Sequence, residues 1–396
     1  MTTVLVPLVT MLLIHVVVSA AFLTLPVVAP AAAPDVGIDP ALVGFYTSLA
    51  YSGAMVSSLM TGALIVRLGA IRTAQIGLAL AALGLAIATG GTPGFMVLSA
   101  LVVGVGHGPM TPVGAHVLMG RTPPGVLALV FSIKQTGVPL GLFMVGAVVP
   151  TLVVMFGWRI GVLAVAGTCA LAACALQPLR AAIDADRAPG NPISFGSIIA
   201  PIRLVFGSQR LRQLTLVSSV FGIAQFCFSS FFVVYLTGGL GVDLISAGLY
   251  FSSAQMAGLV ARLAWGVLTD RTGAPRIVLG GLGVAIAGAA LATASLTPAW
   301  PGVAILAVAL LFGFTAIGWN GVLLAEVARQ APEGKAGAAT AGLLFMFGAT
   351  MLVGPSGFSM VVTVSGSYGL GYALVALLVV LSALPMFLSV KDDREA

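Results

Sequence analysis

Charged side chains are scarce in this sequence: Asp, Glu, Lys and Arg together make up 7% of its 396 residues, whereas soluble domains carry roughly 25%. So few charges cannot cover the surface of a globular protein, which excludes an ordinary soluble fold. Hydrophobic residues make up 59%, and the 50 glycines and 22 prolines fall largely within apolar runs, as membrane helices tolerate. The expected solvent is therefore the bilayer.

Cysteine and histidine are also rare, with three residues of each. The cysteines, Cys169, Cys174 and Cys227, fall within apolar runs, which favours small packed side chains over a disulfide or a metal site. The formal charge of +6 comes from single basic residues between apolar runs, so it does not indicate a nucleic-acid-binding face. No phosphate-cradling loop with Gly-Lys-Ser/Thr occurs, so neither an enzyme, an ATP-driven pump nor a bound cofactor is expected.

The sequence divides into twelve apolar segments, each long enough for a helix to cross a bilayer, which takes roughly 20 residues. A polar interruption at residues 181–211 separates six segments from the other six. We therefore expect an all-α membrane protein with six-helix bundles at residues 1–180 and 212–396, joined by a cytoplasmic linker. The expected spans are 5–31, 41–66, 72–91, 95–119, 126–150, 157–179, 212–237, 244–269, 276–297, 301–328, 337–362 and 367–390.

Basic residues are distributed unequally between the two sides of the expected membrane. With both termini in the cytoplasm, fourteen of the seventeen basic residues face that side and Arg159 faces the other, which is the positive-inside pattern. We expect a monomeric, multi-pass protein of a bacterial-type inner membrane. The fourteen are Arg67, Arg72, Arg121, Arg180, Arg187, Arg203, Arg210, Arg212, Arg271, Arg276, Arg329, Lys335, Lys391 and Arg394.

An internal repeat relates the two halves. A shift of 204 residues aligns segment 62–72 with segment 266–276, with six of eleven positions identical, and both copies follow the second span of their half. The pattern resembles the loop signature G-x-x-x-D-R-x-G-x-R/K of the major facilitator superfamily, and the resemblance covers the whole chain. It implies two pseudo-symmetric bundles that rock about a midplane site and expose it alternately to each side.

In that family, the loop residues form a cytoplasmic latch that biases the outward-open state. The copy in the second half is complete, whereas the first copy keeps Gly62 and Arg67 but has Val66 in place of the acid. The latch to the second half is therefore expected to differ at the first copy. The residues expected to form the complete latch are Asp270, Arg271, Gly273 and Arg276.

The family's arginine in span four is also missing, because Ala100 stands at its place before Gly104 and Gly106. This substitution argues against proton coupling of the kind that depends on that arginine. Two histidines, His15 in span one and His107 in span four, lie near mid-depth and are candidates for carrying a coupled proton. Hydrogen-bonded packing is the alternative for both.

Apart from the basic residues assigned to the two membrane faces, two lie deep inside expected spans: Lys134 in the fifth and Arg262 in the eighth. At about 1.5 Å per residue, both lie roughly 12–13 Å deep, where a charge costs at least about 2.5 kcal/mol. The resemblance implies that the two spans border one central cavity. No Asp or Glu lies comparably deep, so the expected partner of both cations is a transported anion.

The alternative for these cations is architectural: Lys134 would snorkel to the headgroups and Arg262 would cap nearby carbonyls. However, Arg262 with the following Trp265-Gly266 is similar to span eight of the oxalate/formate exchanger and monocarboxylate carrier branches. There, the matching arginine binds the substrate carboxylate. Lys134 would then take the part of a lysine that the oxalate carrier has in span eleven.

The resemblance thus implies a secondary transporter of a small organic anion, a mono- or dicarboxylate, driven by proton symport or anion exchange. The first alternative is a multidrug or hydrophobic-compound exporter of the same superfamily, although the lack of a deep acid argues against cationic drugs. The second is a receptor or sensor on a transporter scaffold. Polar residues that would contact the substrate, or else pair helices, are Gln255, Gln225, Asn320 and Tyr51.

Overall fold

The computed structural model describes residues 2–123, 126–188, 199–332 and 335–392. The chain forms two compact units, Met1–Gly196 and Ser197–Ala396. Their boundary falls inside the expected linker, of which residues 189–198 lie outside the described residues. Within the described ranges the units contain helices and no strand.

Twelve helical segments among the described residues are long and apolar enough to cross a membrane, six in each unit. They match the twelve predicted spans one for one, with ends that differ by several residues at most, and confirm the predicted fold class. Each segment folds as a helix because a bilayer offers no partner for exposed backbone N–H and C=O groups.

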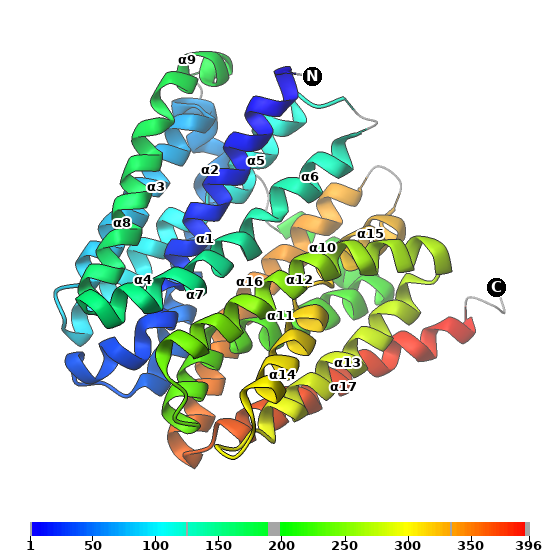
Figure 1. Ribbon diagram of the computed structural model, residues 1–396. Coiled ribbons are helices and arrows are strands. Elements are labelled where there is room, and N and C mark those ends of the chain that lie inside the picture. Colours follow the sequence, from blue (N-terminus) through cyan, green and yellow to red (C-terminus); the bar gives the residue numbers. More distant parts are fainter. Residues whose placement is uncertain (1, 124–125, 189–198, 333–334, 393–396) are drawn as a thin grey trace. The chain divides into compact units, whose positions relative to one another are not determined.

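The first unit is a helical bundle in which α1 packs along α7, and α3 along α4 and α8 (Figure 1). Its elements are α1 (Thr2–Val36), η1 (Pro40–Leu42), α2 (Val43–Leu68), α3 (Ala70–Ala88), α4 (Pro93–His107), α5 (Met110–Met119), α6 (Leu127–Gln135), α7 (Gly137–Phe156), α8 (Trp158–Ala175), η3 (Gln177–Leu179), α9 (Arg180–Ile183) and η4 (Asp184–Asp186).

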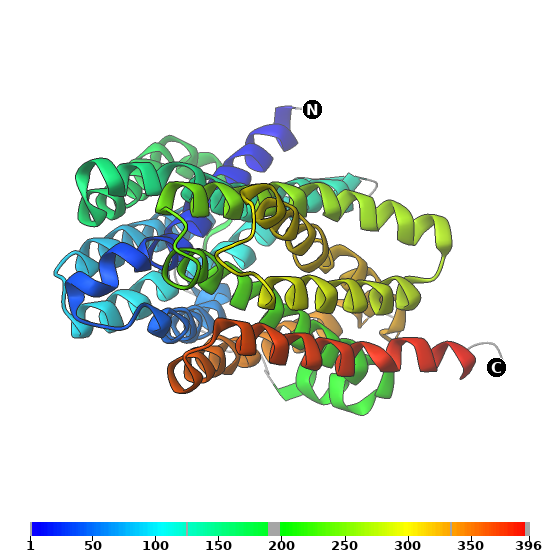
Figure 2. The same ribbon diagram turned by 60° about the horizontal axis from the view of Figure 1, so that its bottom comes forward.

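The second unit is also a helical bundle, in which α13 and α17 lie side by side (Figures 1 and 2). Stacked rings fill part of its core; those of Phe228 and Phe312 are 4.3 Å apart between centroids. Its elements are α10 (Ile199–Gly207), α11 (Gln209–Val234), η5 (Tyr235–Gly239), α12 (Leu244–Thr272), α13 (Pro275–Ala294), α14 (Gly302–Ala316), α15 (Asn320–Gln330), α16 (Ala336–Ser365) and α17 (Tyr368–Asp392).

Glycine allows close helix packing in the first unit. A Cβ atom at Gly104 of α4 would overlap the backbone of Ala50 in α2, and one at Gly106 would overlap the backbone of α3 at Gly77. The two glycines therefore let α4 approach both neighbours closely, which is how membrane helices gain packing energy without a hydrophobic driving force.

Within the described spans, α4 gives way to α5, α6 to α7, and α14 to α15. The first two breaks have a proline at or just after them. Pro109 directly precedes α5, and Pro139 has no N–H to donate to the carbonyl of Gln135, where α6 ends. Such breaks expose backbone polar groups inside a membrane protein, where they need partners.

Candidate functional site

Lys134 is buried at the break between α6 and α7. It lies in the last turn of α6, 1% of the residue is exposed, and its Nζ donates to the Thr111 carbonyl at 3.4 Å. Thr111 belongs to the first turn of α5, at the neighbouring break. The lysine stem fits because residue 114 is glycine: a Cβ there would lie 2.5 Å from the lysine Cε. A snorkelling lysine would expose its ammonium, and this one is enclosed.

No carboxylate partners Lys134 among the described side chains of the first unit. The sequence has no Asp or Glu between Asp39 and Asp184. Asp35 pairs instead with Arg159 at 2.6 Å, and Asp39 caps η1 by accepting from the N–H of Ala41 at 2.8 Å. The remaining described carboxylate, Asp184, accepts from the backbone at the start of α3. Lys134 is therefore a buried cation without an acidic neighbour in that part of the chain.

His15 of α1 is joined to Lys134 through Thr111. Its Nδ1 lies 3.1 Å from the Met11 carbonyl, which can only accept, so Nδ1 carries the proton in the neutral ring. Its Nε2 is then an acceptor for the Thr111 hydroxyl, 3.5 Å away. His15 is 2% exposed, whereas Thr111 is exposed. The structure thus brings the predicted residues Lys134 and His15 together at Thr111, which is exposed.

Arg262 lies in α12 of the second unit, at the break between α14 and α15. Its Nε donates to the Ile317 carbonyl at 3.3 Å, and Trp265 one turn later donates to the Phe314 carbonyl at 2.9 Å. A cation near carbonyls at a helix C-terminus is favourable, and this contact is the one expected of an architectural arginine. Anion binding by Arg262 stays a prediction, as does a cavity shared with Lys134 of the other unit.

The other predicted binding residues are distributed over several helices. In the second unit, Gln255 of α12 and Gln225 of α11 are buried, and Asn320 begins α15. The Gln255 Nε2 has no hydrogen-bond partner among the described residues. In the first unit, the rings of Tyr51 and His107 both contact Phe22, at centroid distances of 5.0 and 4.5 Å. The structure thus brings these two rings together around Phe22.

An apolar cavity of about 280 Å³ lies elsewhere in the first unit, between α1, η1, α2 and α4. Its lining includes Leu25, Val36 and Tyr46. None of the residues predicted to bind substrate lines it.

The predicted latch of the second unit has a buried member. Arg276, at the start of α13, is 4% exposed, and its Nε lies 3.1 Å from Glu326 of α15. Glu326 also pairs with Arg329 at 2.8 Å and accepts from Gln330 at 2.9 Å. This carboxylate fixes α13 to α15. The other latch residues, Asp270, Arg271 and Gly273, are exposed. The sequence pattern did not predict the pairing of Arg276 with Glu326, which lies 50 residues away.

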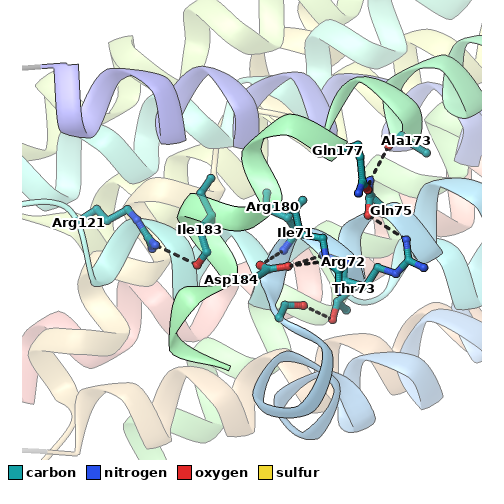
Figure 3. Close-up of polar contacts among 11 residues, drawn as sticks. Ile71, Arg72, Thr73, Gln75, Arg121, Ala173, Gln177, Arg180, Ile183 and Asp184 are labelled. Carbon is teal, nitrogen blue, oxygen red and sulfur yellow. Dashed lines mark hydrogen bonds and ion pairs between the residues drawn. The ribbon is translucent and has the colours of Figure 1, made fainter. Parts of the chain in front are cut away.

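In the first unit, where Val66 replaces the expected acid, a different carboxylate occupies the loop. Asp184 accepts from the N–H groups of Ile71 at 2.7 Å and Arg72 at 3.1 Å, and so caps the start of α3 (Figure 3). Gly69 permits this arrangement, because its φ is +95° and a Cβ there would overlap the Asp184 carboxylate. The other residues predicted here, Gly62 and Arg67, are exposed on α2.

Asp184 belongs to a segment, residues 180–188, that we call the strap. Its Ala188 N–H donates to the Val66 carbonyl at 2.8 Å, and Arg121 donates to the Ile183 carbonyl at 3.0 Å (Figure 3). Residues 181–188 belong to the expected linker. In the structure they pack against the first unit, because their polar groups satisfy backbone groups left open between α2 and α3.

Comparison with known proteins identifies the family. The model of the Major Facilitator Superfamily matches residues 10–355. An uncharacterized MFS-type transporter of Mycobacterium tuberculosis is 28% identical over 170 residues, which cover 43% of this chain and 37% of that protein. The chain thus matches little more than a third of the length of that relative.

Solved transporter structures share the fold. The nucleoside transporter NupG has a TM-score of 0.79 at 15% identity, over 96% of this chain and 99% of that chain. A POT family transporter in complex with 5-aminolevulinic acid has a TM-score of 0.80 at 12% identity, over 96% and 95%. A bacterial homolog of the human lysosomal transporter Spinster has a TM-score of 0.75 at 15% identity, over 97% and 96%. At these identities the likeness shows the fold alone.

Proposed function

The chain belongs to the Major Facilitator Superfamily, and we propose that it is a secondary transporter of a small organic anion, a mono- or dicarboxylate. The two bundles would work by alternating access, in a bacterial-type inner membrane with both termini cytoplasmic. The asymmetry of basic residues supports this orientation.

The burial of Lys134 carries the proposal. The residue is 1% exposed within a membrane span, and the hydrogen bond from its Nζ to the Thr111 carbonyl is long at 3.4 Å. Enclosing a cation without a carboxylate costs several kcal/mol by general estimates. A residue that lowers stability in this way is explained if a negatively charged ligand neutralises it during the transport cycle.

The position of the cations at helix breaks also supports the proposal. Secondary transporters bind substrates and ions where membrane helices are discontinuous. Lys134 lies at the end of α6, and Arg262 contacts the end of α14. We propose Lys134 as the principal anion-binding residue and Arg262 as a second one.

Counterflow in proteoliposomes tests the anion proposal. The purified full chain is reconstituted, and exchange of radiolabelled formate, lactate, oxalate and succinate is measured for the wild type and for Lys134→Met. Methionine keeps the length of the side chain but removes the charge. Because a hydrogen bond to a charged group contributes about 1.5–3 kcal/mol, KM for the transported anion should rise about 10- to 150-fold. Arg262→Gln, which keeps amide donors for the Ile317 carbonyl, enters the same assay.

Lys335→Met is the matched control, because Lys335 is exposed at the start of α16 and its loss removes the same charge. A second readout separates binding from architecture. If Lys134 binds the anion, Lys134→Met should leave the free energy of unfolding unchanged or raise it by up to about 4 kcal/mol, as when buried ionic groups are replaced by apolar ones. Anion counterflow with unaltered KM in Lys134→Met would reject the assignment.

A further inference from the structure

His15, Thr111 and Lys134 form one cluster in the first unit, in which the two bases are buried and Thr111 is exposed. The Thr111 hydroxyl lies 3.5 Å from the His15 Nε2, and the Thr111 carbonyl lies 3.4 Å from the Lys134 Nζ. The two bases come from α1 and α6, and a single residue of α5 contacts both. The sequence pattern predicted each base separately, and gave no indication that they share a partner.

Glycines make room for both bases. A Cβ at position 114 would lie 3.0 Å from the Lys134 Nζ, and a Cβ at position 137 would lie 2.8 Å from the His15 Cβ. Close packing of α1 on α7 at Gly137 and of α6 on α5 at Gly114 therefore encloses the pair. Such an enclosed pair of bases is costly, so each base must be neutral or be matched by negative charge.

The hydrogen bonds of His15 determine which atom can take a proton. The Met11 carbonyl holds the Nδ1 proton in place at 3.1 Å, so protonation must occur at Nε2, the nitrogen that faces Thr111. A rotation of the Thr111 hydroxyl frees Nε2 for this step, and the exposure of Thr111 offers a route for a proton. A protonated Nε2 would then direct a second N–H toward Thr111, whose carbonyl accepts from Lys134.

The charges around His15 link protonation to anion binding. Helices α2 to α8 pack against α1; the titratable groups that act on the ring are Lys134 of α6 and His107 of α4, and α7 carries none. The ammonium of Lys134 repels a proton on His15 when no anion is bound. An anion on Lys134 removes this repulsion, and by linkage a proton on His15 strengthens anion binding equally.

We propose that His15 is the proton-binding residue of this transporter, taking up one proton at Nε2 when an anion binds to Lys134 and releasing it with the anion. The inference rests on the proposed anion transport, and it selects proton symport over simple anion exchange. The proton moves from water to Nε2 and back to water, and no bond other than N–H forms or breaks.

A pH gradient across proteoliposomes tests the inference. Vesicles with the full chain receive radiolabelled formate or lactate from an outside solution one pH unit more acidic than the inside, and protein-free vesicles give the background. One proton per monovalent anion predicts about tenfold accumulation. His15→Asn keeps an amide that can still donate to the Met11 carbonyl. In this variant the background-corrected ratio of inside to outside anion concentration should fall to about one. Counterflow should persist, because exchange requires no net proton release.

His116→Asn, at an exposed position of α5, is the control and should accumulate the anion like the wild type. A purely structural role for His15 would reduce counterflow and gradient-driven uptake together, which would overturn the inference. So would tenfold accumulation in His15→Asn, or a wild type whose uptake ignores the pH gradient. The last result needs no variant and holds even if His15→Asn fails to fold. Absence of any anion counterflow in the wild type would instead remove the proposed function, and the inference with it.

Discussion

Replacing Asp184 with alanine should destabilise the first unit more than the loss of an ordinary helix cap. Asp184 is 4% exposed, and its carboxylate accepts hydrogen bonds from two backbone N–H groups, at 2.7 and 3.1 Å. Hydrogen bonds to charged groups contribute about 1.5–3 kcal/mol each, while replacement of a typical cap costs about 1 kcal/mol. Water can reach part of the vacated space, so we expect a loss of about 3 kcal/mol in the free energy of unfolding.

Urea unfolding of the detergent-solubilised protein, followed by tryptophan fluorescence, measures this loss. Asp39→Ala is the matched control, because Asp39 is an exposed cap that accepts from the N–H of Ala41, and its loss should cost at most about 1 kcal/mol. Gly69→Ala adds a second measurement, since its methyl group would overlap Asp184. In the Asp184→Ala background that overlap is gone and only the strain of the positive φ remains, so the two effects should be less than additive.

The reasoning about Asp184 would be refuted by two results. One is a change below about 0.5 kcal/mol for Asp184→Ala, the range of ordinary surface substitutions. The other is strict additivity of Gly69→Ala and Asp184→Ala, which would mean that the carboxylate does not occupy the space over Gly69.

Two further predictions concern the second unit. Glu326→Gln should lower the free energy of unfolding in urea by about 3–5 kcal/mol, because it leaves Arg276 buried without its carboxylate. Glu326→Leu combined with Arg276→Met should recover most of this free energy. No recovery in the double variant would contradict the pairing. Asp243 caps α12, outside the spans, and hydrogen bonds from the Ser246 hydroxyl and N–H hold its pKa below the ordinary 3.8. The charge of Asp243 therefore stabilises the fold above pH 3.8, and this stabilisation is lost as the pH falls through the lowered pKa. Asp243→Asn should thus have a lower melting temperature than the wild type at pH 7 and the same melting temperature in strong acid. A constant difference would contradict this.

The membrane spans could be predicted because each satisfies a local criterion. A run such as Val4–Val36 is apolar throughout, and its helical state follows from the bilayer without knowledge of its neighbours. The repeat between segments 62–72 and 266–276 predicted where the paired loops lie. Pro139 predicts a bend in span five, because a proline frees a backbone carbonyl. The breaks in spans four and ten were not predicted, although Pro109 was a visible signal for the first.

The contacts of the candidate site could not be predicted in the same way. Hydropathy gives the depth of Lys134 and His15, but their common contact with Thr111 depends on how α1, α5 and α6 are rotated and packed. The cap on α3 could not be predicted either, since Asp184 lies 113 residues from Ile71 in a segment whose polarity is typical of a linker. Local patterns specify elements, whereas these pairs are specified by tertiary packing.

The strap changes where the first half of this protein ends as a self-sufficient piece. Hydropathy alone would place a cut for co-expressing the halves from two genes just after residue 180. Such a cut would give the Asp184 carboxylate and the Ala188 N–H to the wrong fragment, leaving the junction of α2 and α3 without its partners. A break introduced after Ala188 would instead leave a fragment that carries every group it needs to close that junction by itself.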